Sequence, residues 1–178
     1  IQRLDEHIVE SICEQTEGVC VPAVYNAPRL VVISGERGSV SSASEQLAHA
    51  GAMVTPLTVS APFHSPILEP AADRLSEDLA QVEFGPLRFP YVANIDAQWI
   101  EDSTPQEIRQ RLVQQVTGVV RWKQSITVMF EHGIDRFWHL GPGRSNLTHV
   151  KKQHRRTPTA SMDTEDDINR ILNELEAS

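Results

Sequence analysis

Apolar and polar residues follow helical and then strand spacing in the first third of the chain. Asp5 is a residue type that caps helices, and the apolar positions after it recur every three to four residues. Residues 19–25 and 30–34 are rich in β-branched side chains and are separated by a short turn containing Asn and Pro. This pattern predicts a helix followed by two antiparallel strands.

The next residues continue the alternation of helix and strand. Apolar spacing predicts a helix over 40–50, which ends at Gly51, and a strand over 53–59. With one further strand before Asp5, the order becomes βαββαβ, the ferredoxin-like arrangement. Ile1 is then the last residue of that first strand. We therefore expect residues 1–59 to form a ferredoxin-like small subdomain whose first strand is truncated.

The pattern changes after Ser65, where longer amphipathic segments separate short apolar runs. Helices are expected from about residue 68 to 82, over 104–115 with Ser103 or Thr104 as the cap, around 122–130, after a Ser145 cap, and after Asp163 or Thr164. Strands are expected over 91–94, 134–140 and 157–162. Helices alternating with strands indicate an α/β fold with a parallel layer over residues 60–178.

Composition and charge narrow the function classes. No apolar run reaches the roughly 18 residues of a membrane span, and the net charge of −8 argues against a protein that binds nucleic-acid backbones. The two cysteines, Cys13 and Cys20, lack metal-ligand spacing, so we expect two reduced, buried thiols in a cytoplasmic protein and no metal site. The first residue is not Met, and we expect the chain to start inside a longer protein.

His64 is the histidine with the strongest chemical context. It follows a predicted strand and precedes a long predicted helix, at a strand end where α/β folds build their sites. Pro62 and Pro66 restrict the loop around it, which would hold a general base in place. On these features alone, both a structural and a catalytic histidine remain open. A base needs a nucleophile, and the sequence contains no Gly-x-Ser-x-Gly elbow.

Four segments together carry a resemblance to a known family. They are VSAPFHSPILEPAA at 59–72; YNAP at 25–28 with VVISG at 31–35; VQQV at 113–116 with VRW at 120–122 and Ser125; and LGPGR at 140–144. In order and spacing, this set resembles the malonyl-CoA:acyl carrier protein transacylases, over nearly the whole chain. The resemblance covers only the second half of such an enzyme. It implies that the ferredoxin-like subdomain is inserted in a larger, α/β-hydrolase-like acyltransferase domain whose N-terminal half, with its nucleophilic serine, is absent.

The resemblance also implies roles for particular residues. His64 matches the histidine that activates the serine and then the carrier-protein thiol, and Gln115 matches the glutamine whose main-chain carbonyl orients that histidine. Because the carbonyl does this, the Gln115 side chain is expected to tolerate change. Phe63 matches a position beside the acyl pocket that favours malonyl over methylmalonyl groups. Asn26 falls in the matched hairpin and is taken as substrate-binding.

The sequence departs from the family pattern in three ways. Leu30 stands where a glutamine is expected, Met53 and Val54 stand where basic residues are common, and His139 replaces a usual acidic residue. The first two departures bear on contacts to coenzyme A or the carrier protein at this edge. No role follows from the sequence for His139.

The function predicted from the resemblance is malonyl transfer from malonyl-CoA to acyl carrier protein in fatty acid synthesis. It implies no cofactor, no membrane or nucleic-acid partner, and a monomer when the protein is complete. The alternatives are a polyketide-supplying acyltransferase, an acyl hydrolase of the same fold, and a non-catalytic ferredoxin-like binding module.

Overall fold

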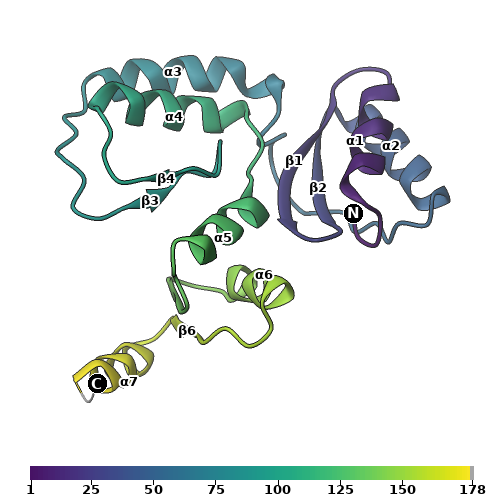
Figure 1. The fold of residues 1–178 in the computed structure, drawn as a ribbon. Helices are drawn as coiled ribbons and strands as arrows, with labels where there is room; N and C mark the ends of the chain where they lie inside the picture. The colour runs from purple at the N-terminus through teal and green to yellow at the C-terminus, as the bar shows by residue number, and fades with distance from the viewer. Residues whose placement is uncertain (177–178) are drawn as a thin grey trace. The chain divides into compact units, whose positions relative to one another are not determined.

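The computed structural model describes residues 1–176, and the chain forms two compact units, Ile1–Val128 and Met129–Ser178 (Figure 1). Both units contain helices and strands, in agreement with the predicted mixed α/β class. The subdomain boundary predicted at residues 59 and 60 falls inside the first unit and stays a prediction.

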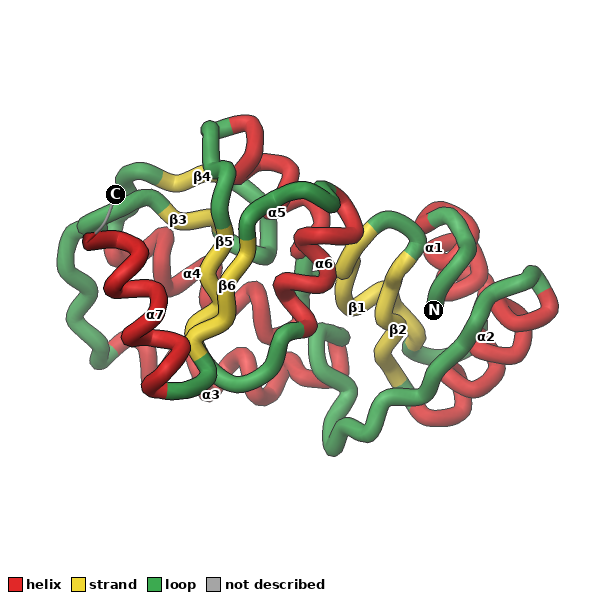
Figure 2. The backbone as a smooth tube through the Cα atoms, turned by 90° about the horizontal axis from the view of Figure 1, so that it is seen from below, coloured by secondary structure: helices red, strands yellow, loops and turns green. Residues whose placement is uncertain are grey.

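The N-terminal part of the first unit is a hairpin covered by two helices. Its elements are α1 (Glu6–Gln15), β1 (Cys20–Ala27), β2 (Leu30–Gly35) and α2 (Arg37–His49). Strands β1 and β2 pair antiparallel, and both helices lie on the same side of them (Figures 1 and 2). The helices bury their apolar faces against the hairpin, and the fully buried side chains there include Val9, Val31 and Leu47. The helix–strand–strand–helix prediction is confirmed.

The segments flanking this hairpin only partly match the prediction. Gln2 makes antiparallel bridges to Leu30 on one side and to Met53 on the other. The strand predicted over residues 53–59 is wrong, because only Met53 pairs and the following residues are irregular. At Arg3 the backbone leaves the paired direction, with a φ of 78°, and Pro56 has no N–H to donate. Without a paired partner segment, the 54–59 backbone has no ladder to join.

The rest of the first unit places two packed helices beside a small antiparallel ribbon (Figure 1). Its elements are a short 3₁₀ turn η1 (Pro66–Leu68), α3 (Glu69–Ala80), β3 (Tyr91–Val92), β4 (Trp99–Ile100) and α4 (Pro105–Thr117). Helix α5 (Trp122–Glu131) begins in this unit, and its last three residues belong to the second. Thr104 caps α4, since its hydroxyl accepts a hydrogen bond from the Glu107 N–H while the Glu107 carboxylate accepts from the Thr104 N–H. Of the two predicted caps, Thr104 is therefore correct. Strand β3 falls within the strand predicted over 91–94, whereas its partner β4 was not predicted.

The second unit contains the predicted parallel pairing. Its elements after α5 are β5 (Phe137–Leu140), α6 (Ser145–Gln153), β6 (Thr159–Met162) and α7 (Glu165–Glu176). Strands β5 and β6 pair in parallel, joined by the helix α6 (Figure 2). Thr164 caps α7 by accepting from the Asp167 N–H. Ser145 is the first residue of α6, so the predicted cap is displaced by one position to Arg144.

Two further expectations concern the cysteines and the membrane. Cys13 and Cys20 are free and buried, with their sulfur atoms 3.7 Å apart. The hydrogen bond between the two thiols, followed by burial, raises the pKa of Cys13, so that it stays protonated. Among residues 1–176, no helix combines the length and the apolar character that crossing a bilayer requires.

Candidate active site

His64 lies on a tight turn between the irregular 54–59 segment and helix α3. Its φ is 59°, in the left-handed region that costs an ordinary residue about 1–2 kcal/mol. The turn is held by its neighbours, because the Phe63 N–H donates to the Ala61 carbonyl at 2.9 Å and the Ser65 hydroxyl donates to the Pro62 carbonyl at 2.7 Å. Ser65 is fully buried, so this hydroxyl bond is shielded from competing water.

The His64 ring contacts the end of helix α4, 51 residues away in the sequence. Its Nδ1 lies 3.0 Å from the main-chain carbonyl oxygen of Gln115. A carbonyl can only accept, so Nδ1 must carry the ring proton, and the Nε2 lone pair of the neutral ring is left free. The carbonyl belongs to the last turn of α4, where backbone oxygens lack intrahelical partners and carry partial negative charge. The predicted contact between His64 and the Gln115 carbonyl is present.

This geometry suits His64 to accept a proton at Nε2. The Gln115 carbonyl fixes the tautomer and would stabilise an imidazolium at His64, the role that a carboxylate has in catalytic triads. The group that gives up the proton is not identified in this chain, whose sequence has no serine elbow. Among residues 1–176, no cluster of three His, Cys, Asp or Glu side chains could hold a metal ion.

The other two predicted site residues are placed less directly. Phe63 precedes the histidine, and its side chain is 49 % exposed, so the ring is not a core residue of the first unit. Asn26 is half-buried on β1. Its neighbour Tyr25 donates its N–H to the Val120 carbonyl at 2.9 Å, which ties β1 to the segment just after α4. The structure thus brings His64 and Gln115 into contact, and it connects Asn26 to them only through the backbone.

Sequence reasoning missed two contributors to this site. Ser65 holds the histidine turn, and the Gln115 side chain bonds to the Gly118 carbonyl at 2.9 Å. A signal for Ser65 exists in the sequence, because a small polar residue between His64 and Pro66 is well suited to a turn that bonds its own backbone. No comparable signal exists for the Gln115 side chain, whose partner is set by the path of the chain after α4.

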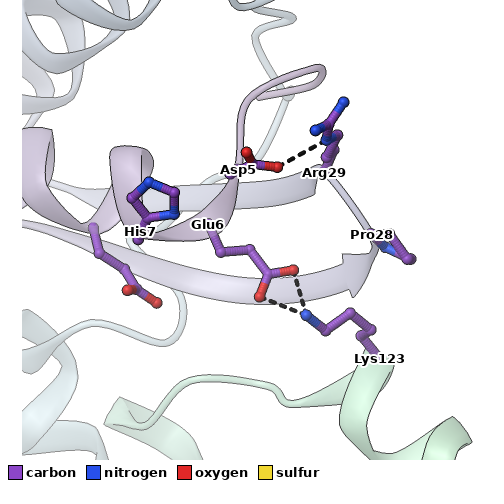
Figure 3. Close-up of a pocket in the computed structure, with 7 residues that line it drawn as sticks. Asp5, Glu6, His7, Pro28, Arg29 and Lys123 are labelled. Atoms are coloured by element: carbon purple, nitrogen blue, oxygen red, sulfur yellow. Dashed lines mark hydrogen bonds and ion pairs between the residues drawn. The ribbon is translucent and has the colours of Figure 1, made fainter.

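A separate hollow of about 480 Å³ lies at the start of α1 (Figure 3). Its charged groups pair with one another, since Arg29 lies 2.8 Å from Asp5 and the Lys123 ammonium contacts both carboxylate oxygens of Glu6 (Figure 3). None of the four predicted site residues lines it. Arg29 and Lys123 are already paired with Asp5 and Glu6, and the Glu10 carboxylate accepts from the Tyr25 hydroxyl, so the candidate active site remains the His64 turn.

Comparison with known proteins places this geometry in context. A family model described as the acyl transferase domain matches residues 4–162. The malonyl CoA-acyl carrier protein transacylase of Escherichia coli strain K12 is 35 % identical over 161 residues, covering 89 % of this chain and 51 % of that protein. The Bacillus subtilis protein of the same name is 32 % identical over 154 residues, covering 86 % of this chain and 48 % of its own length.

Solved structures give the same picture at the level of fold. The MCAT of Streptococcus pneumoniae matches with a TM-score of 0.90 and 37 % identity, over 98 % of this chain and 57 % of that one. A malonyl-transacylase solved in complex with a type II polyketide synthase acyl-carrier protein matches with a TM-score of 0.90 and 32 % identity, over 97 % of this chain and 57 % of that one. The chain spans about half the length of the curated relatives that it matches.

Proposed function

The chain belongs to the acyl transferase domain family, and from that premise we propose that it forms the histidine-bearing part of a malonyl-CoA:acyl carrier protein transacylase. The observation that carries the proposal is the contact between His64 Nδ1 and the Gln115 carbonyl, which leaves Nε2 ready to take a proton. Transacylases of this name from two bacteria are similar over most of the chain. The serine that the reaction needs would come from a segment outside these 178 residues.

The proposed reaction has two half-reactions that use the same histidine. His64 Nε2 takes the proton of the serine hydroxyl as its oxygen attacks the malonyl thioester, and coenzyme A leaves as a thiol with that proton. A malonyl-serine ester remains. His64 then takes the proton of the phosphopantetheine thiol of acyl carrier protein, whose sulfur attacks the ester, and the proton returns to the serine oxygen. No cofactor or metal takes part in this scheme.

Two side chains are proposed to meet the acyl substrate. Phe63 adjoins the base on the restrained turn, and its half-exposed ring is available to border an acyl pocket and to exclude an α-methyl group. Asn26 is proposed as a substrate-binding residue because β1, on which it lies, is hydrogen-bonded to Val120, five residues beyond Gln115. The argument for Asn26 therefore rests on the backbone hydrogen bond between its strand and the segment after α4, and not on a side-chain contact with His64 or Gln115.

We also propose that residues 1–59 are a ferredoxin-like subdomain. The bridges of Gln2 to Leu30 and to Met53 are both antiparallel, and β2 pairs antiparallel with β1. The spatial order is then Met53, Gln2, β2, β1, which is the 4-1-3-2 strand order of a ferredoxin-like sheet reduced to single residues at two strands. This arrangement agrees with an insertion in a larger acyltransferase domain.

One alternative has a specific observation in its favour. A transacylase that resembles this chain was solved with an acyl carrier protein of a polyketide synthase, so supply of malonyl groups to polyketide synthesis is the second candidate. The chemistry is the same in both cases, and the carrier protein differs. Comparing transfer rates to fatty-acid and polyketide carrier proteins separates the two.

The test uses the complete acyltransferase domain, in which this chain is joined to a serine-bearing segment. With radiolabelled malonyl-CoA and rapid quenching, His64→Ala should slow formation of the malonyl-enzyme by about 10²–10⁴-fold, the usual contribution of a general base. His49→Ala, which removes an exposed histidine at the end of α2, is the matched control and should leave the rate unchanged. The 178-residue chain alone should acquire no stoichiometric label.

Three results would contradict the proposal. A His64→Ala rate within about threefold of the wild type removes His64 from the mechanism. Release of malonate to water at the rate of thioester cleavage, without transfer to carrier protein, identifies an acyl hydrolase instead. A complete protein that neither cleaves nor transfers malonyl groups leaves the binding-module alternative.

A further inference from the structure

The turn that follows α4 contains a hydrogen bond from a side chain to the backbone. The Nε2 atom of Gln115 donates to the Gly118 carbonyl at 2.9 Å, and the Gly118 N–H donates to the Gln114 carbonyl at 2.8 Å. The main-chain carbonyl of the same Gln115 accepts from His64 Nδ1. One residue therefore carries both the acceptor that orients His64 and the amide that bonds to the turn beyond it.

The polarity of this side chain is set by its partner. The Gly118 carbonyl can only accept, so the amide must turn its NH₂ group toward it. The other amide atom, Oε1, is buried and has no hydrogen-bond partner within residues 1–176. Burying Oε1 without a partner costs free energy. An exposed glutamine would not have this cost, because its oxygen would bond to water. A glutamate of the same length would set an acceptor against the carbonyl.

The anchor to which the amide bonds is itself fixed on two sides. A β-carbon at Gly118 would lie 2.2 Å from Ile95 Cδ1 and 2.7 Å from the Gln114 carbonyl oxygen, so the backbone there is in close contact with its surroundings. Two residues later, the Val120 N–H donates to the Ala23 carbonyl at 2.8 Å and joins the chain to β1. The Gln115 amide therefore bonds to the residue that ends α4, where the backbone is closely packed and the following chain is joined to β1.

The hydrogen bond from the Gln115 side chain helps to fix the direction of the Gln115 main-chain carbonyl. The last carbonyls of a helix have no intrahelical donor and the terminal turn frays, so their direction depends on other contacts. A bond from the Gln115 amide to Gly118 closes a ring over residues 115–118 and restricts rotation of the peptide unit that carries the carbonyl. The contact to His64 then does not have to hold the helix end by itself.

We propose that the side chain of Gln115 is a positioning residue, whose amide fixes the end of α4 so that the Gln115 main-chain carbonyl holds His64 in its Nδ1–H tautomer. The inference deepens the proposed function and rests on it for its catalytic meaning. It also departs from the expectation that this side chain tolerates replacement. The donor is needed even though the oxygen that touches His64 belongs to the main chain.

The first test reads the tautomer of His64 directly, in the full 178-residue chain labelled with ¹⁵N. Long-range ¹H–¹⁵N spectra recorded at alkaline pH report which of the two ring nitrogens carries the proton. The wild type should show Nδ1 protonated and Nε2 unprotonated. Gln115→Met keeps the length without the donor, and Gln115→Glu reverses the polarity. Both should shift the ratio of the two tautomers by about five- to tenfold, the factor expected for one hydrogen bond.

The control is Gln114→Met, the same change at the neighbouring, exposed position of the same helix end. It should leave the tautomer ratio as in the wild type. If Gln115→Met and Gln115→Glu both retain the wild-type ratio, the proposal is wrong. A lower melting temperature with an unchanged ratio also overturns it, because Gln115 would then only stabilise the helix end. Should one variant fail to fold, the other decides.

The second test measures kinetics in the complete domain. Gln115→Met should lower kcat about tenfold with little change in KM, because it disturbs the base and not the substrate contacts. An unchanged kcat together with a shifted tautomer overturns the catalytic part of the inference. If the wild-type domain transfers no malonyl group at all while the tautomer responds to Gln115, the proposed function fails and the positioning role stands. The two failures are therefore distinguishable.

Discussion

The buried hydroxyl of Ser65 should determine how well the His64 turn is held. His64 has a φ of 59°, a conformation that disfavours non-glycine residues. The Ser65 hydroxyl spans the turn to the Pro62 carbonyl at 2.7 Å, and Ser65 is fully buried. Replacing Ser65 by Ala removes this bond without adding volume or changing the backbone preference greatly. The turn then keeps its strain and loses the contact that offsets it.

The magnitude follows from the geometry. A buried neutral hydrogen bond contributes about 0.5–1.5 kcal/mol, and an acceptor left unpaired costs about 1–3 kcal/mol. The left-handed residue adds about 1–2 kcal/mol that favours relaxation of the turn. We expect Ser65→Ala to lower the free energy of unfolding by about 2 kcal/mol. We expect kcat of the complete domain to fall roughly five- to tenfold, since about 1 kcal/mol of positioning is lost.

Urea denaturation of the chain gives the stability change, and steady-state transfer of malonyl groups by the complete domain gives kcat. The matched control is Ser60→Ala, an exposed serine in the segment just before the turn, which should change neither quantity. Wild-type stability and kcat in Ser65→Ala would refute the reasoning, because they would mean that the Pro62 carbonyl finds another donor and the turn holds its shape unaided.

Two further predictions concern the substrate pocket and the second unit. Phe63→Ser in the complete domain should raise kcat/KM for methylmalonyl-CoA relative to malonyl-CoA by a factor within about 10–200, measured by competition, because the ring no longer excludes the α-methyl group. If both substrates slow together and the melting temperature drops, Phe63 is a packing residue. Burial, and then the charge of Lys152, lower the pKa of His149, so folded His149 resists protonation. In the unfolded chain His149 takes up its proton at about pH 6.5, so the free energy of unfolding should fall as the pH drops below that value. The fall should be smaller in His149→Gln. If urea denaturation shows the same dependence of stability on pH in both proteins, the prediction is wrong.

Local pattern was sufficient for the hairpin and its helices. Their apolar residues recur at helical or strand spacing, and the turn between β1 and β2 has the expected Pro28, although Asn26 lies on β1 and not in the turn. The strand expected over 53–59 failed because a strand exists only with a partner, and pairing there stops at Met53. Strand β4 was missed because its pairing with β3 is a tertiary event, which the residues around Trp99 and Ile100 do not indicate by themselves.

The site was predictable only through resemblance. The spacing of residues gives no reason to join His64 to a carbonyl 51 positions later, and the structure makes that contact because α4 ends beside the turn. The hydrogen bonds of Ser65 and of the Gln115 side chain depend on the same path of the chain. Such bonds follow from where backbones meet in space, and a pattern read along one sequence does not contain that information.

The hydrogen bonds between Val120 and β1 bear on whether residues 1–59 can be cut out as an independent domain. Val120 bridges Val24 in parallel, so a residue from beyond α4 covers an edge of β1. If residues 1–59 were excised at the predicted boundary, Ala23 and Tyr25 would lose their main-chain partners and that edge would be open. Open strand edges pair with other chains and promote aggregation. A fragment cut there should self-associate, whereas one that extends through residue 128 retains its own edge protection.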